Sequence, residues 1–403
     1  MYFEIQPNSN PQFTIHHALS QDLYLNTDSG WQTFTTPEAI VYFKGYHISE
    51  HSDSDFIDLI VSDPKPKYNG FFVAIIQYNT GEIVLTTDLD RGTEIYYNVE
   101  NTLITNLIMS GIIHTATVSD KGNLHQGEYL QIVDSVIKIK NYSPFENYLD
   151  FSPMTEEEVI DSVDGVIRHN FEIMLAKNKS PIKIFLSGGV DSSLTLAYLK
   201  HFTDDFKIIN CEHVDFSEFL CKNWNVFKRR CYVQGMTHFS GPTLTVMGGW
   251  GDERMVRDPQ ICNLLYKLHG STVLDEIENH TDAYQYYIAQ NDFYKSRYQD
   301  QATWPALSSE ETYTRIYNIN MYVQGWGHIE ENIFFNPFKD LQITNYILRA
   351  PFILQKEQFL NATISRKLIE RYDPSLLKCI STYKNKNSLG NLWDVFETYK
   401  QYT

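Results

Sequence analysis

The chain has 403 residues, of which 42% are hydrophobic and 21% charged, as in a folded protein of two or three domains. Its formal charge of −17 argues against an extended contact with nucleic-acid phosphates and favours small-molecule or peptide substrates. No apolar run reaches the roughly 20 residues that span a bilayer, and the first residues lack the basic start and apolar core of a signal peptide. The five cysteines form no CxxC pair, which predicts a reducing, cytoplasmic location.

The first 150 residues are predicted to be rich in β-structure. Apolar runs over 70–78 and 82–88, separated by Asn-Thr-Gly, indicate a β-hairpin. A second hairpin is expected over 128–139, and a short helix or helix-like segment over 101–113 between the two hairpins. A β-rich domain of this kind can be purely structural, without catalytic residues.

A polar stretch over 142–153, which contains two prolines, is predicted to link two domains. Thr155 and Glu158 then form the pattern of a capping box at the start of a helix. Apolar residues recur after it at helical spacing, which indicates a helix face that packs in a core. These residues are Val159, Ile160, Val163, Val166, Ile167 and Phe171.

The most specific motif is the segment 184–193, Ile-Phe-Leu-Ser-Gly-Gly-Val-Asp-Ser-Ser. Its apolar start predicts a buried strand, and its glycines allow backbone amides to approach an anion closely. Ser192 and Ser193 are expected in the first turn of a helix over 194–200, whose N-terminal dipole favours negative charge. These features suit a polyphosphate, and Asp191 among them suits the Mg²⁺ that accompanies one.

Two further strands are expected beside this motif. The sequence predicts a doubly wound α/β domain, because a helix, the strand and loop of the motif, a second helix and a strand over 207–214 follow one another. The ligand of such a domain lies at the carboxyl ends of parallel strands. Cys211 lies in the last part of the strand predicted over 207–214. A cysteine at such a position is more often a small buried side chain than a reactive thiol. Another strand runs into Gly248 and then Asp252, so that Asp191 and Asp252 could hold one metal ion from two sides. The alternative is a glycine loop before a solvated acidic helix start.

The order of these segments resembles that of the class B asparagine synthetases, members of the ATP pyrophosphatase superfamily. Ser-Gly-Gly-x-Asp-Ser-Ser resembles the pyrophosphate loop with which such enzymes cut ATP between its α- and β-phosphates. In the front half, 88–97 resembles the family's Arg-Asp-x-x-Gly-x-x-x-Leu-Tyr-Tyr stretch, and 126–129 its Pro-Gly-Glu. Towards the C-terminus, 327–340 resembles its Glu-x-Arg-x-Pro-Phe-Leu-Asp segment, and 380–390 its lysine loop.

The resemblance implies an α/β protein of two domains. Residues 1–150 would form a degenerate glutaminase-like domain of the N-terminal-nucleophile (Ntn) type, with an αββα arrangement. Residues 154–403 would form an adenylating ATP pyrophosphatase domain, with a doubly wound parallel sheet and a helical extension. The implied cofactors are ATP and Mg²⁺, the latter held by Asp191 and Asp252.

The resemblance also implies a set of site residues. The residues expected to contact ATP are Leu186, Ser187, Gly188, Gly189, Asp191, Ser192, Ser193, Cys211 and Gly248. A lysine of the C-terminal loop would stabilise negative charge on the α-phosphate and in the acyl transition state. Lys384 is favoured for this role because Ser388 follows it by four residues, as in the family's loop, and Lys386 is the alternative. Two lysines in a polar loop can also be simply solvated, without any role in a site.

Three departures separate the chain from the family. A glutaminase of this class uses an N-terminal cysteine, whereas position 2 is Tyr2 and no cysteine precedes Cys211. Gly249 aligns with an acid of the family, for which β-lactam synthetase has a tyrosine, and glycine cannot act as a base. The stretch between Asp191 and Asp252 is shorter than in asparagine synthetases, which indicates a different substrate pocket.

These features predict an AMP-forming amide ligase that joins a carboxylate to an amine or ammonia without hydrolysing glutamine. The β-lactam synthetases and lasso-peptide cyclases are related enzymes that lack the glutaminase cysteine and form amide bonds in this way. Ammonia-dependent asparagine formation is a second hypothesis, and a non-catalytic nucleotide-binding protein is a third. Small molecules or peptides are the expected substrates, without nucleic acid or membrane partners, and a homodimer or a biosynthetic partner protein stays open.

Overall fold

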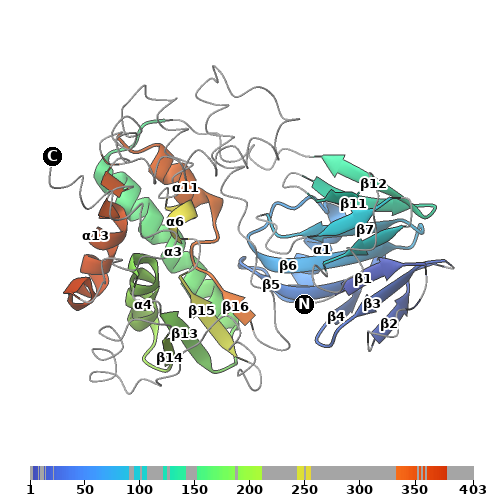
Figure 1. Cartoon of the computed structure of the whole chain (residues 1–403), viewed down its shortest axis with the longest axis horizontal. Coiled ribbons are helices and arrows are strands. Elements are labelled where there is room, and N and C mark those ends of the chain that lie inside the picture. Colours follow the sequence, from blue (N-terminus) through green and yellow to red (C-terminus); the bar gives the residue numbers. More distant parts are fainter. Residues whose placement is uncertain are drawn as a thin grey trace, which may run out of the picture. The chain divides into compact units, whose positions relative to one another are not determined.

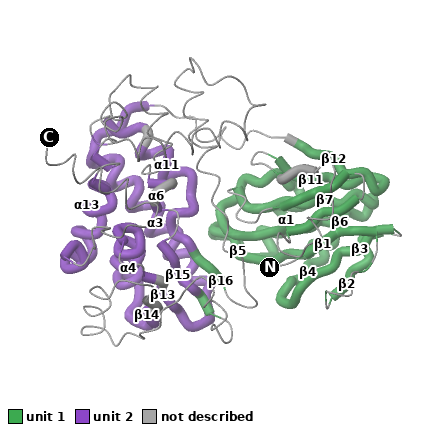
Figure 2. Tube along the Cα trace, in the orientation of Figure 1, with its two compact units in different colours: residues 1–146, 241–244, 323–335 green, residues 147–240, 245–322, 336–403 purple. Residues whose placement is uncertain are grey.

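The chain divides into two compact units, which Figure 2 colours separately. The first comprises residues 1–146, 241–244 and 323–335, and the second 147–240, 245–322 and 336–403. The computed structural model describes residues 3–7, 9, 13, 15–20, 22–89, 95–99, 102–106, 121–124, 128–141, 152–186, 189–210, 243–248, 251–255, 333–351, 354, 357–358 and 361–378. The domain limits expected at 150 and 154 stay a prediction.

The first unit contains two antiparallel sheets, each of six described strands (Figure 1). In one of them, β1 lies between β3 and β9, so that the start of the chain is a central strand. The order is β10 (Lys121–Asn123), β8 (Tyr96–Asn98), β9 (Leu103–Thr105), β1 (Phe3–Gln6), β3 (Tyr24–Thr27) and β2 (Ile15–Ala18).

The other sheet contains both predicted hairpins, which are confirmed. Its order is β12 (Val136–Asn141), β11 (Glu128–Val133), β7 (Ile83–Thr87), β6 (Gly70–Tyr78), β5 (Ala39–His47) and β4 (Gln32–Thr35). The turn between β6 and β7 places Gly81 at a φ of 88°, a conformation that favours glycine. Its N–H donates to the carbonyl of Tyr78 at 3.0 Å, which closes the hairpin.

Helix α1 (Asp53–Ser62) packs against this second sheet. Ser52 caps the helix, because its hydroxyl accepts a hydrogen bond from the N–H of Asp55 at 3.2 Å. Phe56 and Ile60 of α1 are buried in one cluster with inward-facing side chains of the sheet. The cluster comprises Ala39, Val41, Phe43, Phe56, Ile57, Ile60, Val61, Phe72, Ala74, Ile76 and Val84. Burial of each large apolar side chain stabilises the fold by about 1.5–3 kcal/mol.

The helix predicted over 101–113 is wrong at its start. Leu103–Thr105 form β9, which pairs with β8 on one side and with β1 on the other. Strand pairing on both sides satisfies the backbone hydrogen-bonding groups of these residues. This tertiary arrangement outweighs the local sequence pattern that favours a helix. Residues 107–113 lie outside the described part of the chain.

Helix α3 (Glu156–Lys177) opens the second unit with the predicted capping box. The hydroxyl of Thr155 accepts from the N–H of Glu158 at 3.3 Å, and the carboxylate of Glu158 accepts from the N–H of Thr155 at 2.7 Å. The backbone N–H and the hydroxyl of Thr155 both donate to the carboxylate of Glu158, and these two hydrogen bonds lower its pKa. The predicted apolar face of α3 is buried, except that Val166 is partly exposed.

A third sheet has four described strands in the order β14 (Lys207–Asn210), β13 (Ile182–Leu186), β15 (Leu244–Met247) and β16 (Ile333–Phe335). Strands β13 and β14 pair in parallel and are joined through α4 (Val190–Phe202), as in a βαβ unit. The other described helices are α6 (Gly251–Arg254), α11 (Leu341–Leu348), α13 (Thr363–Tyr372) and the 3-10 helix η3 (Pro374–Lys378). Helices α3, α4 and α13 pack against one another (Figure 1). The chain therefore combines antiparallel front sheets with a sheet that contains a parallel pair.

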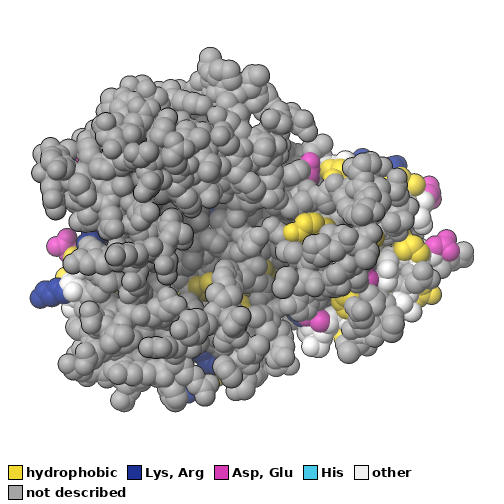
Figure 3. All heavy atoms as spheres, viewed as in Figure 1, with side chains coloured by type: hydrophobic (Ala, Val, Ile, Leu, Met, Phe, Trp, Pro, Cys, Tyr) yellow, Lys and Arg dark blue, Asp and Glu magenta, His cyan; other side chains and the backbone are white. Residues whose placement is uncertain are grey.

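On the face shown in Figure 3, the described surface side chains are mixed in kind, with acidic and hydrophobic ones interspersed. Exposed large hydrophobic residues among those described are Val99, Val136 and Ile139. None of the helices in the described ranges is long and apolar enough to cross a membrane.

Candidate functional site

Two neighbouring strands of the third sheet end in the two glycine segments singled out in the sequence. Strand β13 leads to Gly189 and the start of α4, and β15 leads to Gly248 and α6. Helix α4 begins at Val190 with Gly189 as its N-cap, four residues earlier than the sequence predicts. Asp191 therefore lies in the first turn of α4, where the helix dipole favours bound anions.

The second glycine segment lies directly against Asp191. A Cβ atom at Gly248 would come within 2.7 Å of the carbonyl carbon and oxygen of Asp191 and of the Cα of Ser192. At Gly251, a Cβ atom would come within 2.5 Å of the Asp191 Cβ and 2.6 Å of its Oδ1. Real Cβ atoms do not approach this closely, so both positions require glycine while Asp191 keeps its place.

The hydroxyls of the motif stabilise the first turn of α4. Ser192 Oγ and Ser193 Oγ both donate to the carbonyl oxygen of Gly189, at 3.1 and 2.8 Å. The backbone N–H of Ser193 donates to the same oxygen at 3.0 Å. Ser193 is fully buried and Ser192 is nearly so, whereas Asp191 is partly exposed. Their predicted contact with ATP stays a prediction, and the hydroxyls would have to turn from Gly189 to donate to a phosphate.

The third predicted landmark lies on the strand next to β15. Strand β16 leads to Asp340, whose carboxylate caps α11 by accepting from the N–H of Gln342 at 2.9 Å. Within α11, Thr344 donates its hydroxyl hydrogen to the carbonyl of Arg254 at 3.0 Å. Because Arg254 closes α6, this bond ties α11 to the helix that carries Asp252.

Several predicted site residues lie outside the described part of the chain. They are Ser187, Gly188, Cys211, Gly249, Lys384 and Lys386, together with the side chain of Asp252. Leu186 is fully buried in β13. Among the described residues, no group of three or more His, Cys, Asp or Glu side chains gathers in a way that could hold a metal ion. The proposed metal pair of Asp191 and Asp252 stays a prediction.

A polar cluster at the far end of α4 was not predicted from the sequence. Asp164 of α3 accepts hydrogen bonds from Tyr198 of α4 and from Tyr372 and Arg371 of α13. One signal was available, because Asp164 is an acid beside Val163 on the apolar face of a predicted core helix. Its partners come from distant parts of the chain and could not be read from local pattern.

No family model matches the sequence, and no curated protein matches it. Several solved structures show a distant likeness, including the following two. One is the allosteric regulatory enzyme of purine biosynthesis, at 8% identity and a TM-score of 0.24, over 56% of this chain and 60% of that one. The other is glutamine phosphoribosylpyrophosphate amidotransferase from B. subtilis, complexed with ADP and GMP, at 9% identity and a TM-score of 0.24, over 58% and 63%. The chain thus spans about three fifths of the length of each, and a likeness this distant supports no assignment of function.

Proposed function

We propose that this chain is an ATP-dependent ligase that activates a carboxylate as an acyl-adenylate and transfers the acyl group to an amine or to ammonia. The observation that carries the proposal is the close approach of Gly248 and Gly251 to Asp191. The chain segments that follow two neighbouring strands meet at an acid in the first turn of a helix. This arrangement suits a polyphosphate with its metal ion, at the place where open α/β sheets bind ligands.

The reaction has two steps. A carboxylate oxygen of the substrate attacks the α-phosphorus of ATP, which forms an acyl-adenylate and releases pyrophosphate. The amine then attacks the acyl carbon, loses a proton and expels AMP, so that an amide bond remains. Negative charge develops first around the α-phosphorus and then on the tetrahedral carbon's oxygen, and Lys384 or Lys386 would stabilise both.

The residues at the glycine loops fit magnesium-bound pyrophosphate. Backbone amides in the first turn of α4 would hold phosphate oxygens, and the absence of side chains at Gly248 and Gly251 keeps that turn accessible to the second loop. Asp191 and Asp252 would supply the carboxylate oxygens that Mg²⁺ prefers. When bound there, Mg²⁺ would neutralise part of the charge on the leaving pyrophosphate.

The nitrogen source in this proposal is free ammonia or a substrate amine. The first 210 residues contain no cysteine, so the front domain has no thiol with which to open glutamine. Position 249 is glycine, so any base for the incoming amine comes from elsewhere in the protein or from the substrate itself.

A substrate panel tests the proposal. Purified full-length protein is incubated with MgATP and pairs of carboxylates and amines, including aspartate with ammonia and compounds that carry both groups. AMP, pyrophosphate and the amide are measured together. A pair that yields all three in equal amounts supports the ligase, and aspartate with ammonia as the preferred pair identifies asparagine formation. Tight ATP binding without AMP from any pair would instead favour a nucleotide-binding protein without turnover.

A further inference from the structure

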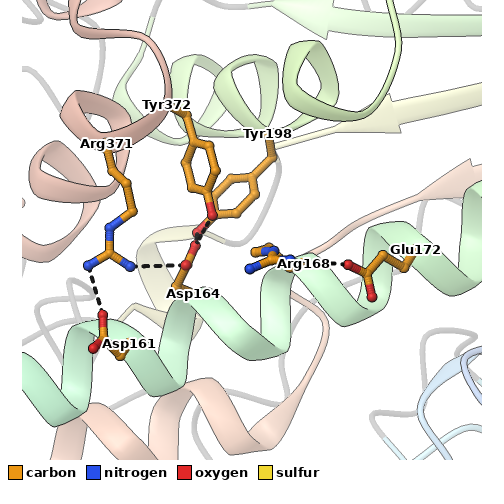
Figure 4. Close-up of polar contacts among 7 residues, drawn as sticks. All are labelled: Asp161, Asp164, Arg168, Glu172, Tyr198, Arg371 and Tyr372. Carbon is orange, nitrogen blue, oxygen red and sulfur yellow. Dashed lines mark hydrogen bonds and ion pairs between the residues drawn. The ribbon is translucent and has the colours of Figure 1, made fainter.

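The buried carboxylate of Asp164 joins the three helices α3, α4 and α13 through hydrogen bonds. The side chain of Asp164, on α3, is 9% exposed. Its Oδ1 accepts from the hydroxyl of Tyr198 at 2.5 Å and from that of Tyr372 at 2.7 Å, and its Oδ2 accepts from Arg371 Nη1 at 3.0 Å. Figure 4 shows these groups converging on Asp164 from the other two helices. Arg371 Nη2 also contacts Asp161, one turn earlier on α3, at 2.8 Å.

Both tyrosines are held as neutral donors. Burial and the neighbouring Asp164 carboxylate raise the pKa of Tyr198 well above its usual value, and burial with the hydrogen bond to Asp164 raises that of Tyr372. The Tyr198 ring is fully buried, stacked on Phe171 of α3 at a centroid distance of 6.0 Å and tilted against Tyr372 at 4.7 Å. Donation to a buried charge makes these hydrogen bonds stronger than neutral ones.

The position of Tyr198 along α4 links this cluster to the phosphate loop. Tyr198 follows Asp191 by seven residues, which is close to two helical turns, so both side chains project from the same side of α4. A bond that fixes the direction of Tyr198 therefore fixes the rotation of α4 about its axis. The same rotation decides where Asp191 points at the other end, against Gly251.

A second tie between α4 and α13 acts at the end of α4. Lys200 forms an ion pair with Asp373, the residue that follows α13. Both ties bring the end of α13 to α4, but Lys200 of the ion pair is partly exposed, whereas Tyr198 and its hydrogen bond to Asp164 are buried. The buried bond is therefore the more specific restraint on rotation.

We propose that Asp164 is a positioning residue, which fixes the rotation of α4 through the hydroxyl of Tyr198 and so directs Asp191 toward the metal ion and the nucleotide. The inference rests on the proposed function and extends it to a residue that touches neither ATP nor the substrate. It assigns to the buried cluster a part in turnover besides its part in stability.

Four variants of the full-length protein test this inference. Tyr198→Phe keeps the ring but removes the hydroxyl. Asp164→Asn keeps an oxygen that can accept from both tyrosines but gives up the charge that faces Arg371. Tyr78→Phe is the matched control, because it removes one tyrosine hydrogen bond, to the carbonyl of Val61 at 2.7 Å, in the front unit. Glu172→Gln is the second control, because it breaks only the exposed pair of Glu172 with Arg168 on α3.

We expect Tyr198→Phe to lower kcat for AMP formation roughly tenfold while the KM for ATP changes less, because misdirected groups cost more in the transition state than in binding. The Mg²⁺ concentration for half-maximal rate should rise with it. Asp164→Asn should keep most of the wild-type kcat, and both controls should keep all of it. All rates are measured well below the melting temperature of each variant, which circular dichroism supplies.

The outcomes separate this inference from the proposed function. A wild-type protein that forms no AMP overturns both. A wild type that forms AMP, with an unchanged kcat in Tyr198→Phe, overturns the inference alone. An equal fall of kcat in Tyr78→Phe also overturns it, because the loss then follows stability. If Tyr198→Phe does not fold, Tyr372→Phe replaces it, since that variant weakens the support of the same Asp164 oxygen from α13, and an unchanged kcat and Mg²⁺ dependence there contradicts the inference.

Discussion

Gly251 lies so close to Asp191 that a Cβ atom at position 251 would stand 2.6 Å from the Oδ1 of that carboxylate. Gly251 begins α6, which follows β15, and Asp191 lies in the first turn of α4, which follows the neighbouring strand β13. The contact shows that the two glycine segments meet at one point of the fold. It also explains, in steric terms, why the second segment has glycine at this position.

Gly251→Ala should damage both the fold and the site. The added methyl group forces Asp191 or the backbone to move, at a cost of about 1–3 kcal/mol, and a displaced Asp191 should weaken MgATP binding. Thermal melting and calorimetric titration with MgATP measure the two effects. Gly165→Ala is the matched control, because a Cβ at this exposed position of α3 meets nothing within 4 Å, and alanine there should be neutral or slightly stabilising. An unchanged affinity for MgATP in Gly251→Ala would contradict this account of the loop.

The protein should not hydrolyse glutamine. The first cysteine of the chain is Cys211, so residues 1–210 offer no thiol as a nucleophile. Strand β1 begins at the fully buried Phe3 and pairs with strands on both sides. Glutamate release from glutamine is measured with and without MgATP and with the substrate pair found in the panel. Turnover clearly above the protein-free background would show that another nucleophile serves the front domain.

Lys384→Ala should lower kcat by roughly a hundredfold while the KM for ATP changes less, because a cation that acts on developing charge contributes mainly in the transition state. Lys386→Ala is the comparison, since either lysine fits the motif. If only the change at Lys386 reduces kcat, the alternative lysine has the role. Normal turnover in both single variants would show that the charge is stabilised by another group, with Arg254 and Arg257 to be tested next.

Alkaline pH should lower the stability of the first unit through the ionisation of Tyr78. Burial, followed by the charge of Glu82, raises the pKa of Tyr78 from about 10 to about 12. A pKa that is raised in the folded state gives stability that is complete below the unfolded value and is lost as pH rises through the folded value. The difference in melting temperature between wild type and Tyr78→Phe should therefore be constant below pH 10 and shift in favour of the phenylalanine variant between pH 10 and about 12. A difference that stays constant to pH 12 would contradict the assignment.

Local patterns in the sequence predicted the elements whose cause is local. The hairpins around Gly81 and over 128–139, the capping box of Thr155, and the strand β13 and helix α4 on either side of the glycine motif are all present. The predicted helix over 101–113 fails at Leu103–Thr105, because the pairing of β9 depends on strands distant in sequence. The contact of Gly251 with Asp191 and the convergence on Asp164 likewise depend on how the elements pack, which residue types alone do not fix.

The identity of the nucleotide product tests the central claim most directly. Wild type and Asp191→Asn are incubated with Mg²⁺, ATP labelled in both the α- and the γ-phosphate and the substrate panel, and the labelled products are separated by ion-exchange chromatography. The account predicts AMP and an equal amount of pyrophosphate from the wild type, dependent on the carboxylate, and a large loss of both in Asp191→Asn because the charge opposite Mg²⁺ is removed. Formation of ADP and phosphate, or an undiminished rate in Asp191→Asn, would contradict it.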